Sequence, residues 1–267
     1  MTRTIQSVED LQAYKQEIIS RPTPKYTVLV GMATCGIASG AGDTKDEFEK
    51  EIAELGLNDI VVKKTGCIGY CFLEPIVEIV DAEGNSTIYT KCTTERVPEI
   101  VQSHLQDGKP LTEGTLVPDM TRISLSEDRE IKTKQIRIAL RNCGAIDPES
   151  IEDYIAHDGY QALAKALFQM QPAEIIDSVI KSGLRGRGGG GFPTGKKWEF
   201  VAKENSPRKN IICNADEGDP GAFMDRSLLE GDPHSILEAM AVAGVATGAT
   251  DGYIYIRAEY PMAVQRL

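Results

Sequence analysis

Residues 25–36 read KYTVLVGMATCG, a run rich in β-branched and apolar residues that leads into a turn carrying Cys35. This composition predicts a strand followed by a loop. Residues 58–71, NDIVVKKTGCIGYC, repeat the pattern, because a second strand-forming run leads into a loop with two more cysteines. Between them, residues 44–56 predict a helix with its apolar side chains on one face. Each of these two strands is therefore followed by a loop that carries cysteine.

The flanking segments extend this order of elements in both directions. Residues 74–81 and 86–92 predict two more strands, and the turn AEGN between them is typical of a hairpin. A helix is expected over 94–108, and a short amphipathic helix over 5–20 precedes the first strand. The order strand, helix, strand, hairpin, helix is a thioredoxin-like arrangement, with the cysteines at the ends of strands.

The second half of the chain has a different pattern, in which helices alternate with strands and the segment between the halves is polar. We therefore expect an α/β fold for this half as well. The predicted elements are helices over 147–170 (broken near Gly159), 172–183 and 233–248, strands that begin at 209 and 251, and a glycine-rich loop over 184–198.

Composition excludes several classes of function. The chain has 267 residues, a formal net charge of −11 and 6% aromatic residues, so a nucleic-acid partner is not expected. It contains no long apolar run and no signal-peptide core, which predicts a cytoplasmic protein with no membrane span. The three histidines, His104, His157 and His234, fall on predicted surfaces and are assigned no chemistry.

Four of the six cysteines lie in the first half, at Cys35, Cys67, Cys71 and Cys92. In a cytosolic chain, clustered cysteines indicate metal or redox chemistry before disulfides. Thiolates on glycine-rich loops suit an iron–sulfur cluster, which needs four ligands. Zinc is an alternative, although C-x3-C without a nearby histidine is poor zinc-finger spacing. Free buried thiols are the remaining alternative.

The motifs ATCGIASGA and GCIGYCFLEPIVEI resemble the thioredoxin-like [2Fe–2S] ferredoxin domain of complex I-type NADH dehydrogenases and NAD(P)-linked hydrogenases. The resemblance covers about residues 25–107. It implies that Cys35, Cys67 and Cys71 are cluster ligands. The family has a second early cysteine that this chain lacks, so we nominate Cys92 as the fourth ligand. If Cys92 is not a ligand, the cluster has three cysteines and another donor, or is absent.

The glycine-rich loop lies within SGLRGRGGGGFPTGKKW, residues 182–198. It contains G-x-G-x-x-G but follows a helix rather than a strand, so it is not a standard dinucleotide fingerprint. Bare backbone still allows a flat cofactor and its phosphates to approach the main chain, and arginines and lysines add positive charge. A flexible linker is the alternative. A second motif, NADEGDPG at 214–221, is an acidic turn after a strand, and by itself it suggests only a surface turn.

Together, SGLRGRGGGGFPTGKKW and NADEGDPGAFMDR strongly resemble the FMN- and NAD(H)-binding subunit of complex I and, more closely, its relatives in NAD(P)-reducing and electron-bifurcating [FeFe] hydrogenases. The match runs from about residue 130 to the end. The resemblance implies that a set of residues contacts FMN or the nicotinamide nucleotide. These are Gly186, Arg187, Gly188 and Lys197 at the FMN phosphate and isoalloxazine, Asn214, Asp216 and Glu217 at the flavin, Phe192 and Phe200 around the nucleotide, and Asp219 in contact with it.

The resemblance implies an oxidoreductase subunit of diaphorase type, which moves electrons between NADH or NADPH, FMN and iron–sulfur clusters in a multisubunit hydrogenase. Its expected partners are a catalytic iron–sulfur subunit, a small [2Fe–2S] subunit and, in some relatives, ferredoxin. A complex I-type or formate dehydrogenase subunit is an alternative, and a redox or metal adaptor without enzyme activity is another.

The expected domains are an N-terminal helix at 1–24, the [2Fe–2S] domain at 25–107, a linker at 108–130 and an FMN- and NAD(H)-binding domain at 131–267. The family continues beyond this point with a cysteine-bound [4Fe–4S] cluster. We therefore expect the last domain to be incomplete and the sequence to be an N-terminal fragment.

Overall fold

The computed structural model describes residues 3–116 and 137–267 and divides them between two compact units. The unit that carries the cysteine loops, here called the thiol unit, comprises Arg21–Ser150, Ser227–Asp232 and Gln265–Leu267. The other, here called the glycine-loop unit, comprises Met1–Ser20, Ile151–Arg226 and Pro233–Val264. Most of the predicted linker at 108–130 lies outside the described residues. The predicted domain boundaries stay a prediction.

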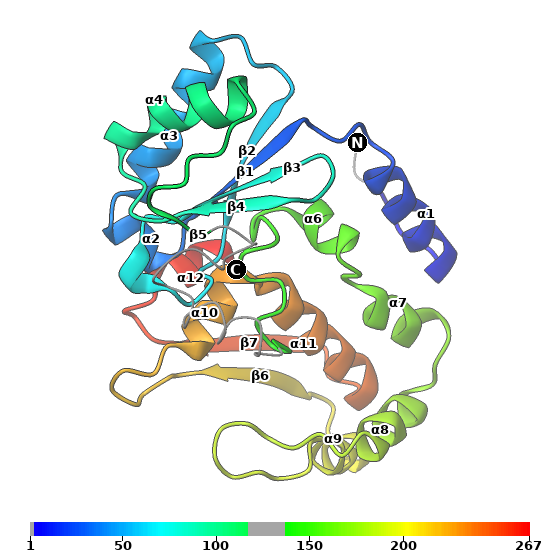
Figure 1. The fold of residues 1–267 in the computed structure, drawn as a ribbon. Helices are drawn as coiled ribbons and strands as arrows, with labels where there is room; N and C mark the ends of the chain where they lie inside the picture. The colour runs from blue at the N-terminus through cyan, green and yellow to red at the C-terminus, as the bar shows by residue number, and fades with distance from the viewer. Residues whose placement is uncertain (1–2, 117–136) are drawn as a thin grey trace. The chain divides into compact units, whose positions relative to one another are not determined.

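The thiol unit is built on a five-stranded sheet in the order β2-β1-β3-β4-β5 (Figure 1). The two strands that precede the cysteine loops, β1 (Tyr26–Gly31) and β2 (Ile60–Thr65), are parallel, with Gly31 opposite Thr65. The other strands, β3 (Val77–Asp81), β4 (Ser86–Tyr89) and β5 (Thr115–Leu116), pair antiparallel. This topology confirms the α/β class, and the strand order is that of the thioredoxin-like arrangement.

Helices pack on this sheet because the apolar residues repeat with helical spacing. α3 (Ala41–Glu54) buries Phe48 completely against β-strand residues such as Val28 and Ile79. Burying one such aromatic side chain stabilises the fold by about 1.5–3 kcal/mol. The helix expected over 94–108 is present as three consecutive turns of different pitch, η2 (Thr94–Arg96), α4 (Val97–Ile100) and η3 (Val101–Gln106).

The prediction that His104 lies on the surface is wrong, because this residue of η3 is buried in the core of the thiol unit. Its Nδ1 lies 2.9 Å from the Tyr89 hydroxyl, and its ring meets Tyr26 edge-on at a centroid distance of 5.4 Å. The hydrogen bond satisfies a ring nitrogen that would otherwise be buried without a partner. Burial lowers the pKa of His104 to about 4, so the ring is neutral at physiological pH.

In the glycine-loop unit, the predicted alternation of helices and a parallel strand pair is confirmed. Strand β6 (Asn210–Ala215) pairs in parallel with β7 (Asp251–Ile256). The helices of this half are α6 (Ile151–Ala156), α7 (Gln161–Phe168), α8 (Pro172–Lys181), α9 (Thr194–Lys203), α10 (Met224–Gly231), α11 (Pro233–Thr247) and α12 (Pro261–Arg266). Helix α1 (Val8–Ile19) belongs to the same unit. The C-terminal ends of α10 and α12 belong to the thiol unit.

A buried carboxylate joins three of these helices. Glu238 on α11 accepts a hydrogen bond from the Tyr154 hydroxyl at 2.6 Å and from the backbone N–H groups of Tyr160 at 2.8 Å and Leu163 at 3.1 Å. The N–H groups at the first turn of a helix lack partners within the helix, and a carboxylate there also interacts favourably with the helix dipole. Glu238 therefore fixes α7 to α11.

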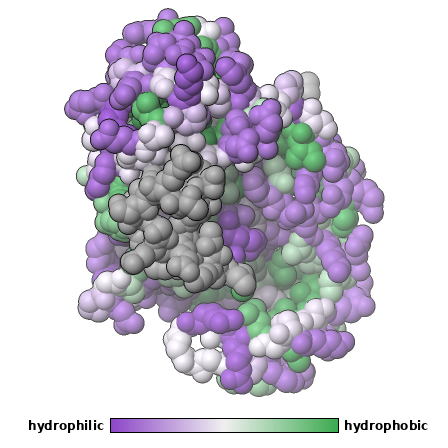
Figure 2. Space-filling view, viewed as in Figure 1, coloured by the Kyte–Doolittle hydropathy of each residue, from purple (hydrophilic) through white to green (hydrophobic). Residues whose placement is uncertain are grey.

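On the face drawn in Figure 2, apolar residues form small separate patches among hydrophilic ones. Among the described residues, none of the helices has the length and apolar character needed to cross a membrane.

Candidate metal centre and flavin site

The parallel pairing of β1 and β2 places the loops that follow them at one edge of the sheet. Cys35 lies on α2 (Thr34–Ala38), soon after β1 ends, and Cys67 lies in the loop after β2. Cys71 begins the short helix η1 (Cys71–Leu73). The three cysteines therefore meet because parallel strands end at the same edge, as their position after strands predicts.

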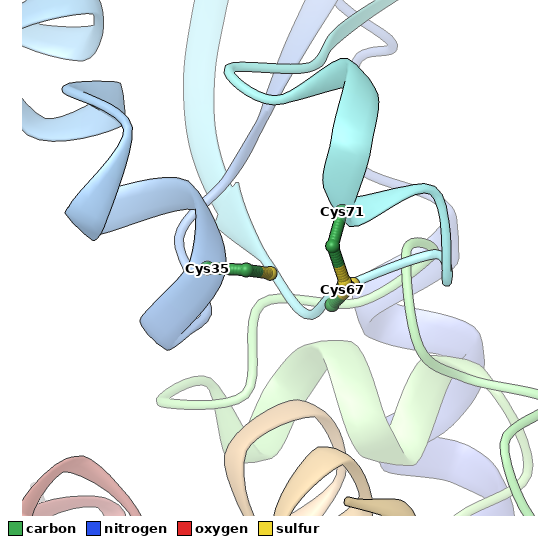
Figure 3. Close-up of side chains that lie close together, drawn as sticks. All are labelled: Cys35, Cys67 and Cys71. Atoms are coloured by element: carbon green, nitrogen blue, oxygen red, sulfur yellow. Dashed lines mark hydrogen bonds between the residues drawn. The ribbon is translucent and has the colours of Figure 1, made fainter. Parts of the chain in front are cut away.

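The three sulfur atoms lie within 4.8 Å of one another (Figure 3). The Cys35 side chain points from α2 toward the other two. The Sγ atoms of Cys67 and Cys71 are 3.6 Å apart, and the Gly69 N–H donates a hydrogen bond to Cys67 Sγ at 3.2 Å. Thiols that converge in this way, with a backbone N–H directed at sulfur, suit a metal ion or an iron–sulfur cluster.

The thiols do not share one electrostatic state. The hydrogen bond from Cys35 lowers the pKa of Cys67 to about 6, with help from the Gly69 amide, whereas the same contact and burial raise the pKa of Cys35. Burial also raises the pKa of Cys71. Cys67 is therefore the thiolate of the group, and the thiolate is the form that binds metals.

The structure does not bring Cys92 to this group. Within the described residues, the side chains whose donor atoms all lie within 4.8 Å of one another are Cys35, Cys67 and Cys71, and Cys92 is not among them. Cys92 is completely buried in the hydrophobic core of the thiol unit, where burial raises the pKa of its thiol to about 12. Its backbone carbonyl accepts a hydrogen bond from the Thr44 hydroxyl at 2.8 Å. These are the surroundings of a packed thiol.

A carboxylate that the sequence analysis missed lies beside the thiols. Glu74 is 3% exposed, and its Oε1 lies 3.7 Å from Cys35 Sγ. Its Oε2 accepts a hydrogen bond from the Ile76 N–H at 2.7 Å. Burial raises the pKa of Glu74 to about 7. The only signal in the sequence was its nearness to Cys71, which does not separate a buried glutamate from an exposed one.

Residues distant in sequence support the loop that carries Cys35. The buried Glu230 accepts hydrogen bonds from the Thr34 N–H at 2.9 Å and from the Thr34 hydroxyl at 2.5 Å, which caps α2. Arg266 donates to the Met32 carbonyl at 2.8 Å and also to the Glu230 carbonyl. The position of Cys35 is therefore held by contacts from the C-terminal part of the chain.

In the other unit, the glycine-rich loop connects α8 to α9 and is closed at its base (Figure 1). The Gly186 N–H donates to the Phe192 carbonyl at 2.9 Å, and the Thr194 N–H donates to the Leu184 carbonyl at 2.9 Å. Gly189 has a φ of +94°, in the left-handed region that favours glycine. The two hydrogen bonds make the segment a defined loop rather than a linker.

The loop forms part of the wall of a cavity of about 570 Å³. Four of the predicted flavin residues line it, Gly186, Gly188, Phe192 and Lys197, together with residues of α9, β6 and α11. A Cβ at Gly188 would meet no atom within 4 Å, so a ligand could lie against the backbone there. This volume falls in the range of pockets that bind cofactors.

The remaining predicted flavin residues do not line this cavity. Phe200 is 56% exposed, and its ring lies 6.2 Å from that of Phe192, so the two form an exposed aromatic pair. Arg187 and Asp219 are exposed on the glycine loop and the acidic turn. Exposed aromatic and charged groups are available to a ligand, but their positions alone do not define one.

The acidic turn follows β6 and is organised by its own side chains. Asn214 Oδ1 accepts a hydrogen bond from the Asp216 N–H at 3.1 Å. The Glu217 carboxylate accepts from the N–H groups of Asp225 at 2.9 Å and Arg226 at 3.2 Å, at the start of α10. Glu217 thus fixes the turn to a helix N-terminus, which an anionic side chain stabilises.

One family of known proteins matches the last third of the chain. Residues 179–267 match the family model described as the Nuo51 FMN-binding domain. This range contains the glycine loop, the cavity and the acidic turn.

Relatives of known name match the chain over different lengths. The NADP-reducing hydrogenase subunit HndC of Solidesulfovibrio fructosivorans is 64% identical over 134 residues, which are 50% of this chain and 27% of that protein. An NADH-quinone oxidoreductase subunit of Rhizobium meliloti is 49% identical over 49% of this chain, which corresponds to 31% of the length of that protein. The NAD-reducing hydrogenase HoxS subunit alpha of Cupriavidus necator is 27% identical over 95% of this chain, which corresponds to 40% of the length of that protein.

These matches confirm the resemblance drawn from the sequence. The chain is related to oxidoreductase subunits of NAD(P)-reducing hydrogenases and of NADH-quinone oxidoreductases. It spans 27% to 40% of the length of these three relatives.

Proposed function

We propose that the protein binds FMN and an iron–sulfur cluster and serves as an electron-transfer subunit between NAD(P)H and the iron–sulfur centres of a multisubunit hydrogenase. One observation carries the proposal. The glycine-lined cavity lies within the residues that match the FMN-binding family, in a chain that also brings three cysteines together. Bound flavin supplies the conversion between two-electron and one-electron transfer, while the protein supplies position and electrostatics.

The glycine loop is suited to hold a flavin phosphate and ring. Gly186 and Gly188 present bare backbone to the cavity, and Lys197 on the first turns of α9 also lines it. A helix N-terminus with a lysine attracts a phosphate, because unpaired N–H groups and positive charge converge there. We assign these residues, with Arg187, to FMN.

The acidic turn and the aromatic pair complete the proposed site. Asn214 and Asp216 offer hydrogen-bond acceptors for hydroxyl groups, and Glu217 acts by fixing the turn to α10. Phe192 and Phe200 offer exposed ring faces for stacking on the nicotinamide nucleotide, and aromatic stacking favours such planar ligands. We assign Asp219 to the nucleotide as well. The choice between NADH and NADPH stays open.

Cys35, Cys67 and Cys71 are the proposed cluster ligands from the thiol unit. Three converging sulfur atoms and a backbone N–H at Cys67 support a cluster rather than three inert thiols. We favour a hydrogenase over a complex I-type dehydrogenase because the relative that is 64% identical and the relative that matches 95% of this chain are both named as hydrogenase subunits. The partners would be the other subunits of such an assembly in the cytoplasm, including a catalytic iron–sulfur subunit.

The test is a cofactor analysis of the intact protein, purified without oxygen. We expect flavin, iron and acid-labile sulfide in the same preparation, and bleaching of the flavin absorbance when NADH or NADPH is added. Lys197→Ala should weaken FMN binding by about 10- to 150-fold, since one charge-assisted contact contributes about 1.5–3 kcal/mol.

Lys203→Ala is the matched control, because Lys203 lies at the exposed end of the same helix and pairs with Glu199 at 2.8 Å. It should leave FMN binding unchanged. A preparation without flavin would overturn the flavin assignment, and flavin that neither nucleotide reduces would overturn the electron-transfer function. Equal loss of FMN in both variants would remove Lys197 from the site.

A further inference from the structure

The Glu74 carboxylate is buried beside the thiol group. It makes hydrogen bonds with the Ile76 N–H and the Cys35 thiol, and the positive charge of Lys91 offsets only part of the cost of its burial. Burying a carboxylate without a cation is costly, and such groups are usually paired or bound to a metal. A metal ion bound beside Glu74 would compensate the remaining cost of burying its charge.

The backbone opposite Glu74 leaves room for the carboxylate. Gly31 ends β1, and a Cβ on Gly31 would lie 3.3 Å from Glu74 Oε2 and 3.4 Å from Oε1. The contact with Oε2 is tighter than side chains usually make, so a side chain at position 31 would require the carboxylate to shift by a few tenths of an ångström. Glycine at position 31 leaves the carboxylate in its place beside Cys35.

The donor atoms lie close enough together to serve one cluster. Cys67 Sγ and Cys71 Sγ are 3.6 Å apart, Cys35 Sγ and Glu74 Oε1 are 3.7 Å apart, and Cys35 Sγ lies within 4.8 Å of both other sulfur atoms. Two ligands on one tetrahedral metal, with metal–sulfur bonds of about 2.3 Å, are separated by about 3.7 Å. Glu74 Oε1 therefore lies at ligand spacing from Cys35 Sγ, and with it the chain offers the four protein ligands that a two-iron cluster needs.

We propose that Glu74 is the fourth protein ligand of the cluster, beside Cys35, Cys67 and Cys71. The inference rests on the proposed function, since it names a ligand of the cluster proposed there. The carboxylate takes the place of the cysteine that the chain lacks. The cluster then has one iron with two sulfur ligands from the protein and one with a sulfur and an oxygen ligand.

Mössbauer spectra of the oxidised ⁵⁷Fe-labelled protein, together with iron and sulfide content, test this assignment. The wild type should show two ferric sites that differ, because their protein ligands differ. Glu74→Cys should retain the cluster and bring the two sites closer to equivalence. Glu74→Gln keeps the size of the side chain and an acceptor for the Ile76 N–H, but it should lose iron to a chelator about 10-fold faster or more.

Glu78→Gln is the matched control, because Glu78 is a half-buried glutamate on β3, the strand that follows Glu74 in the chain. It should leave both spectrum and iron content unchanged. Circular dichroism of each variant establishes that it is folded, and Glu74→Gln carries the test if Glu74→Cys does not fold.

The outcomes separate this inference from the proposed function. Iron and sulfide in the wild type, with the same spectrum and chelator resistance in Glu74→Gln, would overturn the ligand assignment and leave the cluster in place. Loss of the cluster in Cys92→Ser with retention in Glu74→Gln would make Cys92 the fourth ligand. One iron without sulfide would overturn the two-iron arrangement, and absence of iron from the wild type would overturn the proposed cluster itself.

Discussion

Gly36 is the position at which a single methyl group should most directly disturb the cysteine loops. It lies on α2 beside Cys35, and a Cβ there would lie 1.9 Å from the Gly31 carbonyl oxygen. Real Cβ contacts are essentially never shorter than 3.0 Å, so Gly36→Ala must move α2 from the end of β1 by about 1 Å. The partner is backbone of a central strand, which cannot swing aside as a side chain can.

The magnitude follows from two opposing effects. Alanine is favoured over glycine within a helix by up to about 1 kcal/mol, whereas overpacking a tight contact costs about 1–3 kcal/mol. We expect Gly36→Ala to lower the free energy of unfolding by about 1–2 kcal/mol. A shift of about 1 Å also exceeds the tolerance of about 0.2 Å for metal–ligand distances, so the iron content should fall with it.

Gly42→Ala is the matched control, because Gly42 lies on the next helix, α3, and a Cβ there meets no atom within 4 Å. It should be neutral or stabilising by up to about 1 kcal/mol and should retain iron. Urea unfolding followed by circular dichroism, with iron analysis of the same samples, measures both effects. If Gly36→Ala were as stable as Gly42→Ala and held as much iron, the close packing of α2 on β1 would be wrong.

Two further predictions concern buried groups of the thiol unit. Cys92→Ser should keep its iron, but its free energy of unfolding should fall by about 1–3 kcal/mol because a hydroxyl replaces a thiol in the apolar core. Iron analysis and urea unfolding of the variant measure the two effects. An iron-free variant with unchanged stability would contradict both. His104 has a pKa of about 4 when folded and an ordinary value of 6.5, so the unfolded chain takes up the proton first as the pH falls. The contribution of His104 to the free energy of unfolding is therefore complete above about pH 6.5 and declines as the pH falls toward 4. Between pH 7 and pH 5 it falls by about 2 kcal/mol. His104→Gln should weaken this pH dependence in urea titrations at the two pH values, and an unchanged difference would show that other groups cause it.

Local sequence was sufficient to predict the elements and three of the converging side chains. The β-branched runs of β1 and β2 each end at a cysteine loop, and parallel strands bring those loops to one edge of the sheet. The closed glycine loop was likewise predicted as a functional segment, because its glycines are flanked by arginine, phenylalanine and lysine. These features depend on neighbours in the chain or on one simple topology.

The residues that the sequence did not reveal depend on long-range contacts. Glu230 caps α2 although it is distant from Thr34 in sequence, and Arg266 donates to the Met32 carbonyl from near the last described residue. His104 was expected on the surface because a histidine in a helical pattern carries no sign of its partner. The burial of each group depends on the partner that satisfies it, and local patterns do not identify that partner.

Position 31 and position 74 show why the fourth donor could not be found from cysteine spacing. The sequence shows that one family cysteine is missing, and this directs attention to the remaining thiol, Cys92. The structure instead places Cys92 in the core and a buried carboxylate against a glycine at the cysteine loops. A glycine in one strand and a glutamate before another become complementary only when β1 and β3 pair. If the carboxylate binds iron, the missing cysteine is compensated by a residue of a different type in the segment before β3. Sites of this kind must therefore be searched for by burial and donor spacing rather than by cysteine count.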